Sequence, residues 1–335
     1  MSAPYPWLAE AWSRLQQARL ADTLPHALLL RGRAGFGKRE LAEALVASLL
    51  CEAPAAEGAR CGQCRGCGLL NAGTHPDFRD VRPEEAGKSI VIDQIRELGE
   101  FFMLRPHYGA RKIAVIAPAD AMNRAAANSL LKLLEEPPVG GMLVLVADRA
   151  ERLPATIRSR CQGYALDRLD PAAMLRDQRG LPAPVSAESL ARAGGSPLAA
   201  GRFETPELKN AIDALAPLMA SVLAGATSPL EAATRWGKLD LLLLVDQMLR
   251  VSHELFLLAN HAALPLAEAG RATGRDLQRM ADGIDSARLA RFVQQALELK
   301  QLRLGATSAR EGDLIESLWF EWQRVGPLAA RQGEV

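Results

Sequence analysis

The glycine-rich segment 32–38 constrains the fold of this chain more than any other stretch. Four apolar residues, 27–30, precede it, and a helix-like run, 39–50, follows it. A buried strand, a glycine turn and a helix in this order are the context that makes a phosphate-binding loop credible. Such a loop offers backbone N–H groups and a helix N-terminus to an anion. The segment therefore favours an α/β protein whose first strand ends at a phosphate loop.

The loop departs from the usual pattern directly after its lysine. Gly32, Gly35, Gly37 and Lys38 fit a phosphate loop, but Arg39 stands where a Ser or Thr hydroxyl would hold Mg²⁺. A guanidinium has no acceptor atom and cannot coordinate a metal. A nucleotide could still bind to the loop, whereas Mg²⁺ binding is not expected. The alternative interpretation is a glycine turn that only joins a strand to a helix.

A second buried strand, predicted over 112–116, ends without the carboxylates of a nucleotide hydrolase. Ala117 and Pro118 stand where acids would hold Mg²⁺ and prepare water. We interpret Asp120 as the N-cap of a helix over 121–136. Together with Arg39, these residues predict a nucleotide-hydrolase fold that does not hydrolyse. The alternative is an active ATPase with unusual metal ligands, at Asp120 or Asp148.

Strands and helices alternate through the first half of the chain. Further strands are expected over 77–81, 142–147 and 164–166, with helices over 7–20 and 92–103. This alternation favours a parallel sheet covered on both faces. From residue 170 onward no strand is expected, and beyond residue 205 the apolar spacing is helical, most clearly over 239–258, 286–300 and 314–325.

The length of 335 residues indicates two or three domains. We expect an α/β nucleotide-fold domain over 1–167, a small helical lid over 168–205 and an all-helical C-terminal collar over 206–335. The net charge of +1 gives no global attraction to nucleic acid. The sequence has no apolar run of about 20 residues and no signal-peptide pattern, so a cytoplasmic protein is expected.

Four of the five cysteines form a dense cluster at about 51–67. Cys61, Cys64 and Cys67 follow a C-x-x-C-x-x-C spacing, and Cys51 lies shortly upstream. Two short spacings and one longer one are typical of a tetrahedral zinc site, and such a closed site is structural. The alternatives are free buried thiols and a zinc module that binds DNA. Cys161 is remote in sequence and is left out of the predicted site.

Several motifs together resemble the AAA+ clamp-loader subunits of bacterial DNA polymerase III, most closely the delta-prime group. Beside the glycine loop and the cysteine insertion, they are His75, Pro76 and Asp77, the segment 128–138 (NSLLKLLEEPP) and the segment 153–161 (LPATIRSRC). The motifs cover residues 25 to 165, and the helical remainder is similar only in kind.

The resemblance implies a role for Arg160, which by itself would be a surface charge like Arg158. In the family, the arginine of the Ser-Arg-Cys motif reaches into the ATP site of the neighbouring subunit as an arginine finger. A guanidinium offers a fixed, permanently charged fork for the γ-phosphate. The family's ATPase subunits also carry an arginine in the region where this chain has Pro197 and Leu198. This third departure again points away from an ATPase.

The resemblance also implies partners and cofactors. We expect a hetero-pentamer with gamma or tau ATPase subunits and the delta subunit, acting on the sliding clamp and primed DNA, with no membrane involved. Structural Zn²⁺ is expected at the four cysteines, and ATP binding by this chain stays open. The chain is thus predicted to be a stator-like part of a DNA-directed DNA polymerase complex, and not an ATPase by itself.

Overall fold

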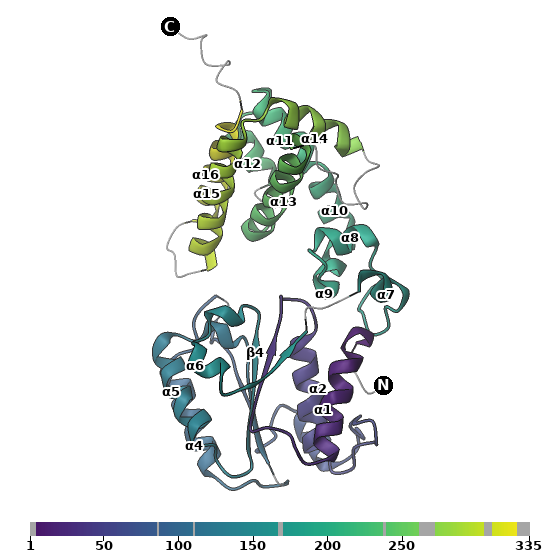
Figure 1. The fold of residues 1–335 in the computed structure, drawn as a ribbon, viewed down its shortest axis with the longest axis vertical. Helices are drawn as coiled ribbons and strands as arrows, with labels where there is room; N and C mark the ends of the chain where they lie inside the picture. The colour runs from purple at the N-terminus through teal and green to yellow at the C-terminus, as the bar shows by residue number, and fades with distance from the viewer. Residues whose placement is uncertain are drawn as a thin grey trace. The chain divides into compact units, whose positions relative to one another are not determined.

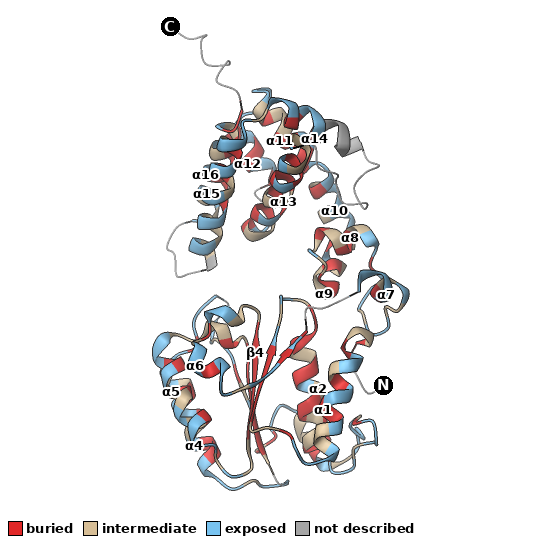
Figure 2. Cartoon of the chain, viewed as in Figure 1, coloured by how far each residue is buried: buried red, intermediate tan, exposed pale blue. Residues whose placement is uncertain are grey.

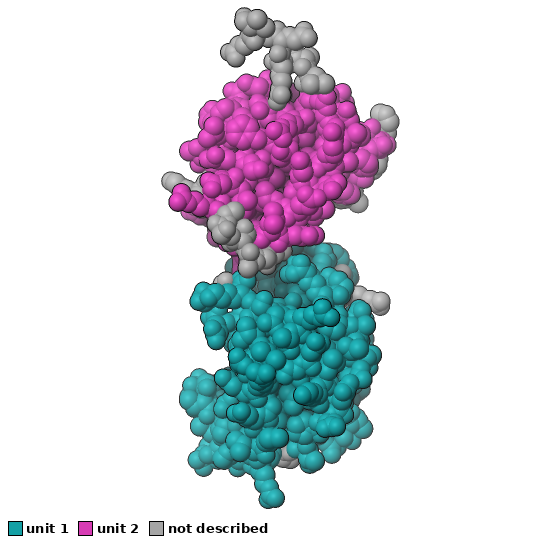
Figure 3. All heavy atoms as spheres, turned by 90° about the vertical axis from the view of Figure 1, so that its left-hand side faces the viewer, with its two compact units in different colours: residues 1–186, 193–201 teal, residues 187–192, 202–335 magenta. Residues whose placement is uncertain are grey.

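The computed structural model describes residues 5–85, 87–109, 111–166, 170–236, 239–260, 272–304 and 310–326. The chain divides into two compact units (Figure 3): a sheet unit of residues 1–186 and 193–201, and a helical unit of residues 187–192 and 202–335. The three-part division expected from the sequence is finer than this and stays a prediction. Its boundary at 167–168 lies outside the described residues.

A five-stranded parallel sheet with the order β2-β3-β4-β1-β5 organises the sheet unit. Its strands are β1 (Ala27–Arg31), β2 (Phe78–Val81), β3 (Lys112–Ile116), β4 (Gly141–Ala147) and β5 (Gln162–Ala165). The long apolar runs of β1, β3 and β4 fit central strands that are covered on both faces. The predicted parallel sheet is confirmed, although β5 begins two residues before the expected 164–166 segment.

The helices of the sheet unit lie on both sides of the sheet. They are α1 (Ala9–Leu20), α2 (Lys38–Leu50), α3 (Arg65–Asn71), α4 (Ile92–Met103), α5 (Arg124–Glu135), α6 (Ala155–Arg158), α7 (Pro171–Arg176) and α9 (Pro197–Ala200). Short 3₁₀ turns of this unit are η1 (Pro6–Leu8), η2 (Ala119–Ala121) and η3 (Ala150–Arg152). A further 3₁₀ turn, η4 (Gly201–Glu204), begins at the last residue of the sheet unit and continues into the helical unit. Helices α1 and α2 cover one face of the sheet, and α4, α5 and α6 cover the other (Figure 1).

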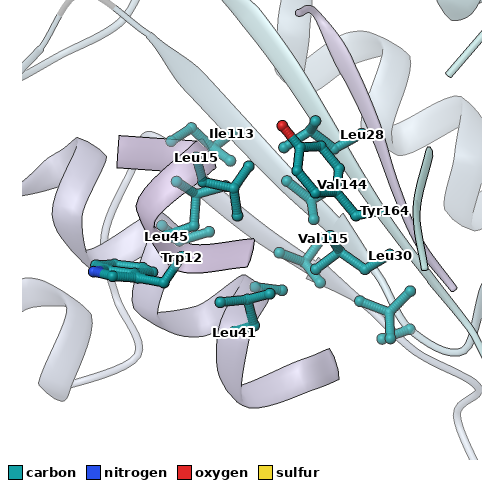
Figure 4. Close-up of a cluster of buried hydrophobic side chains, with 14 of the residues drawn as sticks. Trp12, Leu15, Leu28, Leu30, Leu41, Leu45, Ile113, Val115, Val144 and Tyr164 are labelled. Carbon is teal, nitrogen blue, oxygen red and sulfur yellow. The ribbon is translucent and has the colours of Figure 1, made fainter. Parts of the chain in front are cut away.

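Alternate strand residues enter two separate cores, because successive side chains of a strand point to opposite faces. Leu28 and Leu30 of β1 join the core that contains Trp12 of α1 and Leu41 of α2 (Figure 4). Leu29, between them, joins the core under α4 and α5. The buried residues accordingly follow the strands and the sides of the helices that face the sheet (Figure 2).

The helix expected over 121–136 begins later than predicted. Asn123 is its N-cap, since the Asn123 side chain accepts the Ala126 N–H at 2.8 Å. Asp120 instead lies in the turn η2, and its Oδ1 accepts the Asp148 N–H at 2.9 Å. The interpretation of Asp120 as an N-cap is therefore wrong: its carboxylate joins the ends of the neighbouring strands β3 and β4.

The described part of the helical unit contains helices and no strand, which confirms the helical C-terminal region. The helices are α8 (Ala187–Arg192), α10 (Pro206–Asp213), α11 (Leu215–Leu223), α12 (Pro229–Trp236), α13 (Leu241–Ala259), α14 (Ala272–Gly283), α15 (Ser286–Leu304) and α16 (Glu311–Gln323). Trp322 of α16 anchors the core of this unit. Its ring packs edge-on against Phe292 at 5.0 Å, and its indole N–H donates to the Met219 carbonyl at 2.9 Å.

No helix in the described ranges is both long and apolar enough to cross a membrane.

Asp77, directly before β2, holds the loop that contains His107 and Tyr108. Its side chain is fully buried and accepts the backbone N–H groups of His107 at 2.7 Å and Tyr108 at 2.8 Å. The Lys112 ammonium, also buried, lies 3.8 Å from the same carboxylate. Burial lowers the pKa of Lys112, while the charge of Asp77 opposes that shift. One carboxylate thus satisfies two backbone donors and a buried cation.

Replacing Asp77 by alanine should destabilise the sheet unit by about 3 kcal/mol or more, because it leaves the buried Lys112 ammonium without a counter-charge and two backbone N–H groups without their acceptor. Urea unfolding monitored by circular dichroism measures this loss. Asp93→Ala is the control, since Asp93 is 73% exposed and pairs with Arg96 on the surface of α4. An equal effect of both substitutions would contradict the assigned role of Asp77.

Candidate functional site

The lysine of the glycine loop is buried and paired inside the sheet unit. Lys38 is the first residue of α2 and is 3% exposed. Its ammonium donates to the Arg33 carbonyl oxygen at 2.6 Å and lies 2.6 Å from the carboxylate of Asp148, which follows β4. A buried ammonium needs such partners to offset its lost hydration. The charge that a phosphate loop offers to a nucleotide is therefore satisfied within the chain.

The N-terminal segment covers one side of the loop. The Trp7 indole N–H donates to the Phe36 carbonyl at 3.1 Å, and Tyr5 stacks on Trp7 with ring centroids 4.6 Å apart. Gly37 has a left-handed φ of 84°, and a Cβ there would lie 2.7 Å from the Tyr5 ring. Glycine at this position thus allows both the close approach of the Tyr5 ring and the left-handed turn into α2.

The segment around α9 covers the other side of the loop. The Leu198 N–H donates to the Gly35 carbonyl at 3.1 Å, and a Cβ on Gly35 would lie 2.1 Å from the Ser196 Oγ. The Arg33 guanidinium donates to the Gly194 carbonyl at 2.6 Å. Leu198 also packs against the core beneath α1 and α2.

Arg39 takes part in an ion-pair network at the end of β2. Its guanidinium lies 2.7 Å from the Asp80 carboxylate and 2.9 Å from that of Glu43. Arg82 donates to the same Asp80 oxygen at 2.6 Å. Two arginines therefore share the Oδ2 atom of Asp80, so the charge of Arg39 is used within the chain.

Asp120 and Asp148, the two acids considered as unusual metal ligands, also have partners within the chain. Asp120 accepts the Asp148 N–H, and its other oxygen lies 3.6 Å from the Arg149 guanidinium. Asp148 pairs with Lys38. At the end of β3, Ala117 is buried and offers no donor oxygen on its side chain. These contacts favour a structural role for both acids.

Arg160, in contrast, lies at the surface behind α6. Its side chain is 37% exposed and pairs with Glu135 of α5 at 2.8 Å. It also donates to the Thr156 carbonyl at 3.1 Å. Arg158 is exposed and has no ion pair among the described residues. Sequence reasoning missed Glu135 as the partner of Arg160, although both lie in motifs that carry the family resemblance.

The four clustered cysteines converge as their spacing predicts. Their sulfur atoms lie within 4.8 Å of one another, with Cys51 and Cys64 at 3.9 Å and Cys61 and Cys67 at 4.0 Å. A tetrahedral zinc–thiolate site with bonds of about 2.3 Å has sulfurs about 3.8 Å apart. The donor set therefore fits a metal ion that prefers thiolates, with all four positions filled by the chain. Cys161 is not part of this cluster.

Backbone donors surround the cysteine sulfurs. The Gln63 and Cys64 N–H groups donate to the Cys61 Sγ, and they lower the pKa of Cys61 to about 6. The Cys67 N–H donates to Cys64 and lowers the pKa of that thiol. Burial raises the pKa of Cys67 to about 12. The loop's N–H groups thus favour the thiolate form of Cys61 and Cys64. A bound cation is needed to favour the thiolate form of the buried Cys67.

The parallel sheet, the glycine loop between β1 and α2 and the helices on both faces define an α/β protein of the phosphate-loop class. The family model described as DNA polymerase III, delta subunit, matches residues 7–170. A DNA polymerase III subunit delta' of Pseudomonas aeruginosa is 37% identical over 98% of this chain and 100% of its own length. That of Escherichia coli is 40% identical over 48% of each chain. The chain belongs to the delta' family of DNA polymerase III subunits, which confirms the resemblance drawn from its motifs.

Among solved structures, a DNA polymerase III gamma subunit-related protein of Thermotoga maritima is 18% identical to this chain. The match covers 95% of this chain and 99% of that one, with a TM-score of 0.43.

The purified protein should carry one divalent metal ion per chain, bound by the four thiols. Cys67→Ser should lose this ion, because a hydroxyl does not replace a thiolate ligand. Metal analysis by mass spectrometry and the thiolate absorption of a Co²⁺-substituted sample measure the binding. Cys161→Ser is the matched control and should keep the ion. Equal metal content in wild type and Cys67→Ser would contradict the assignment.

Proposed function

We propose that this chain is a non-hydrolysing, stator-like subunit of the clamp loader that places the sliding clamp on primed DNA. It supplies Arg160 as an arginine finger to the ATP site of a neighbouring ATPase subunit. The observation that carries the proposal is the contrast between two cations: Lys38 is 3% exposed, and Arg160 is 37% exposed. The ammonium of Lys38, in the chain's own glycine loop, is buried, whereas the guanidinium of Arg160, in the Ser-Arg-Cys motif, is accessible to a neighbouring subunit.

The absence of hydrolysis follows from the electrostatics of the loop. Phosphoryl transfer depends on Mg²⁺ and on cations that stabilise charge on the transferred phosphate. Arg39 stands at the position of one Mg²⁺ ligand, and Ala117 and Pro118 stand where acids are needed. Lys38 would have to leave Asp148 to reach a phosphate. Each of these features opposes catalysis at this site.

Arg160 is suited to act on another subunit because its present contacts are weak. An exposed ion pair such as Arg160–Glu135 contributes at most about 1 kcal/mol. Exchanging that carboxylate for a γ-phosphate of higher charge is therefore favourable, and the planar guanidinium can donate two parallel hydrogen bonds. Glu135 holds the guanidinium near the surface until the neighbouring site is presented.

The proposal includes the assembly and its cofactors. The chain joins gamma or tau ATPase subunits and the delta subunit in a cytoplasmic hetero-pentamer, through a collar formed by residues 206–335. Zinc is the metal proposed for Cys51, Cys61, Cys64 and Cys67, since it favours four thiolates in tetrahedral geometry. When bound, it cross-links the end of α2 to the start of α3. ATP and Mg²⁺ act at the neighbouring subunit.

Arg160→Ala should lower ATP turnover of the reconstituted assembly. An arginine finger contributes about 10³-fold or more to the rate at its site. The turnover of the assembly should therefore fall by the fraction that the ATP site next to this subunit contributes to it. Steady-state phosphate release measures the change, and size-exclusion chromatography checks that the assembly forms. Arg158→Ala is the matched control, with the same charge removed two residues away. Unchanged turnover in an intact Arg160→Ala assembly would remove Arg160 from the mechanism.

A further inference from the structure

We propose that a groove in the helical unit binds a linear segment of a partner protein in which an acidic residue lies beside an apolar one. The groove consists of two hollows that meet at Leu223, Ala224 and Gly326. The first hollow has a volume of about 750 Å³ and the second about 500 Å³. Both volumes are within the range of about 300–1,000 Å³ that ligand sites occupy.

The groove lies where α11 and α16 end, beside the first turns of α15. Helix α11 contacts α14 and α16, and α11 and α14 lie side by side in the helical unit (Figure 1). Every residue that lines the groove belongs to this unit. The site is therefore complete within one compact part of the chain, apart from the glycine loop, Arg160 and the cysteine cluster.

The first hollow carries an excess of positive charge. Its charged lining residues are three arginines and one glutamate: Arg288, Arg291, Arg324 and Glu321. Arg324 pairs with Glu321. The Arg288 guanidinium lies 3.8 Å from the carboxylate of Asp285, which is not part of the lining. The charge that remains uncompensated is thus that of Arg291.

Arg291 is the cation that a ligand can reach. It is exposed and forms no ion pair with any residue that the structure describes. Arg288 and Gln295 lie one turn before and after it on the same side of α15. A hydrogen bond from Arg288 to the Gly326 carbonyl at 2.6 Å fixes this side of α15 to the end of α16. A carboxylate placed here can accept hydrogen bonds from the Arg291 guanidinium and the Gln295 amide.

The carbonyl groups at the end of α11 do not compete for Arg291, because they have donors of their own. The Gly225 N–H donates to the Val222 carbonyl at 3.1 Å, and the Ala226 N–H donates to the Ser221 carbonyl at 3.0 Å. The positive charge is therefore left for an acidic occupant.

Apolar side chains form the rest of the groove. Buried side chains line the first hollow: Val222, Phe292 and Val325. The second hollow is lined from α11 and from the end of α14: Pro217, Ala220, Met280 and Ile284. Ala220 is small and only half-buried, so the second hollow has room for one larger apolar side chain.

A peptide fits this combination better than a nucleic acid does. A nucleic-acid interface commonly neutralises about 6–10 phosphates along an extended surface, whereas this groove has three arginines and one of them is paired with Glu321. A small anion would occupy the first hollow and leave the apolar one empty. Charge complementarity and the apolar hollow together select a segment with a carboxylate for Arg291 and an aliphatic or aromatic side chain for the space above Ala220.

The test uses the full chain and a library of random heptapeptides. Wild type should enrich peptides in which Asp or Glu is adjacent to Leu, Ile or Phe. A selected peptide should bind at least about tenfold more weakly to Arg291→Glu, because the substitution replaces an attraction by a like-charge repulsion. Fluorescence anisotropy measures the affinity. Ala220→Trp, which fills the second hollow and keeps the arginines, should weaken binding by a similar factor.

The matched control is Arg202→Glu, which makes the same charge change at an exposed position of the helical unit outside the groove. This variant should bind the peptide like wild type. Circular dichroism shows that each variant is folded. The affinity of wild type should also fall as salt is raised, since salt screens an exposed charge pair.

Absence of acidic and apolar enrichment would overturn the proposal, and so would equal weakening in the control. Binding of an oligo(dT) strand that depends on Arg291 would overturn it in favour of nucleic acid. Peptide binding that requires deletion of residues 327–335 would identify the chain's own C-terminal segment as the ligand, and it would also overturn the proposal. None of these outcomes bears on Arg160, whose test is the turnover of the assembly.

Discussion

The pairing of Lys38 with Asp148 and the Arg33 carbonyl is the contact on which the arrangement of the glycine loop depends. A buried ammonium is stable only with compensating charge and hydrogen bonds, and in a phosphate loop the nucleotide provides part of that compensation. Here the chain provides it, at 2.6 Å on each side. The loop has therefore become a packing element. It joins the N-terminal aromatic pair, the sheet and the segment around α9 through the bonds of Phe36 and Gly35.

This internal use of the loop agrees with the other departures from a nucleotide hydrolase. Arg39 pairs with Asp80, and Asp120 bonds to the end of β4. The charged side chains of Lys38, Arg39 and Asp120 near the expected metal site thus each have a partner within the chain. The proposed activity moves to the surface, where Arg160 is held by a weak pair. In this account the subunit keeps the architecture of an ATPase and contributes to hydrolysis at the ATP site of a neighbouring subunit.

The sequence was sufficient for features that depend on local pattern. Apolar runs and glycine turns predicted the parallel strands, and cysteine spacing predicted the cluster, because both are set by residues close in the chain. Contacts between distant segments were not foreseen. The pairing of Arg160 with Glu135, the contact of Ser196 with Gly35 and the bond from Asp148 to Asp120 depend on how the strands are ordered in the sheet. A carboxylate after a strand can cap a helix or join a neighbouring strand, and local sequence does not distinguish these outcomes.

Equilibrium binding of a fluorescent ATP analogue to the isolated full-length chain, with Mg²⁺ present, tests the central claim most directly. The account predicts no saturable binding at concentrations that saturate an ordinary phosphate-loop protein, and the same result for wild type and Lys38→Ala. Tight, Mg²⁺-dependent binding that Lys38→Ala abolishes would show that the loop opens to nucleotide, and it would contradict the account.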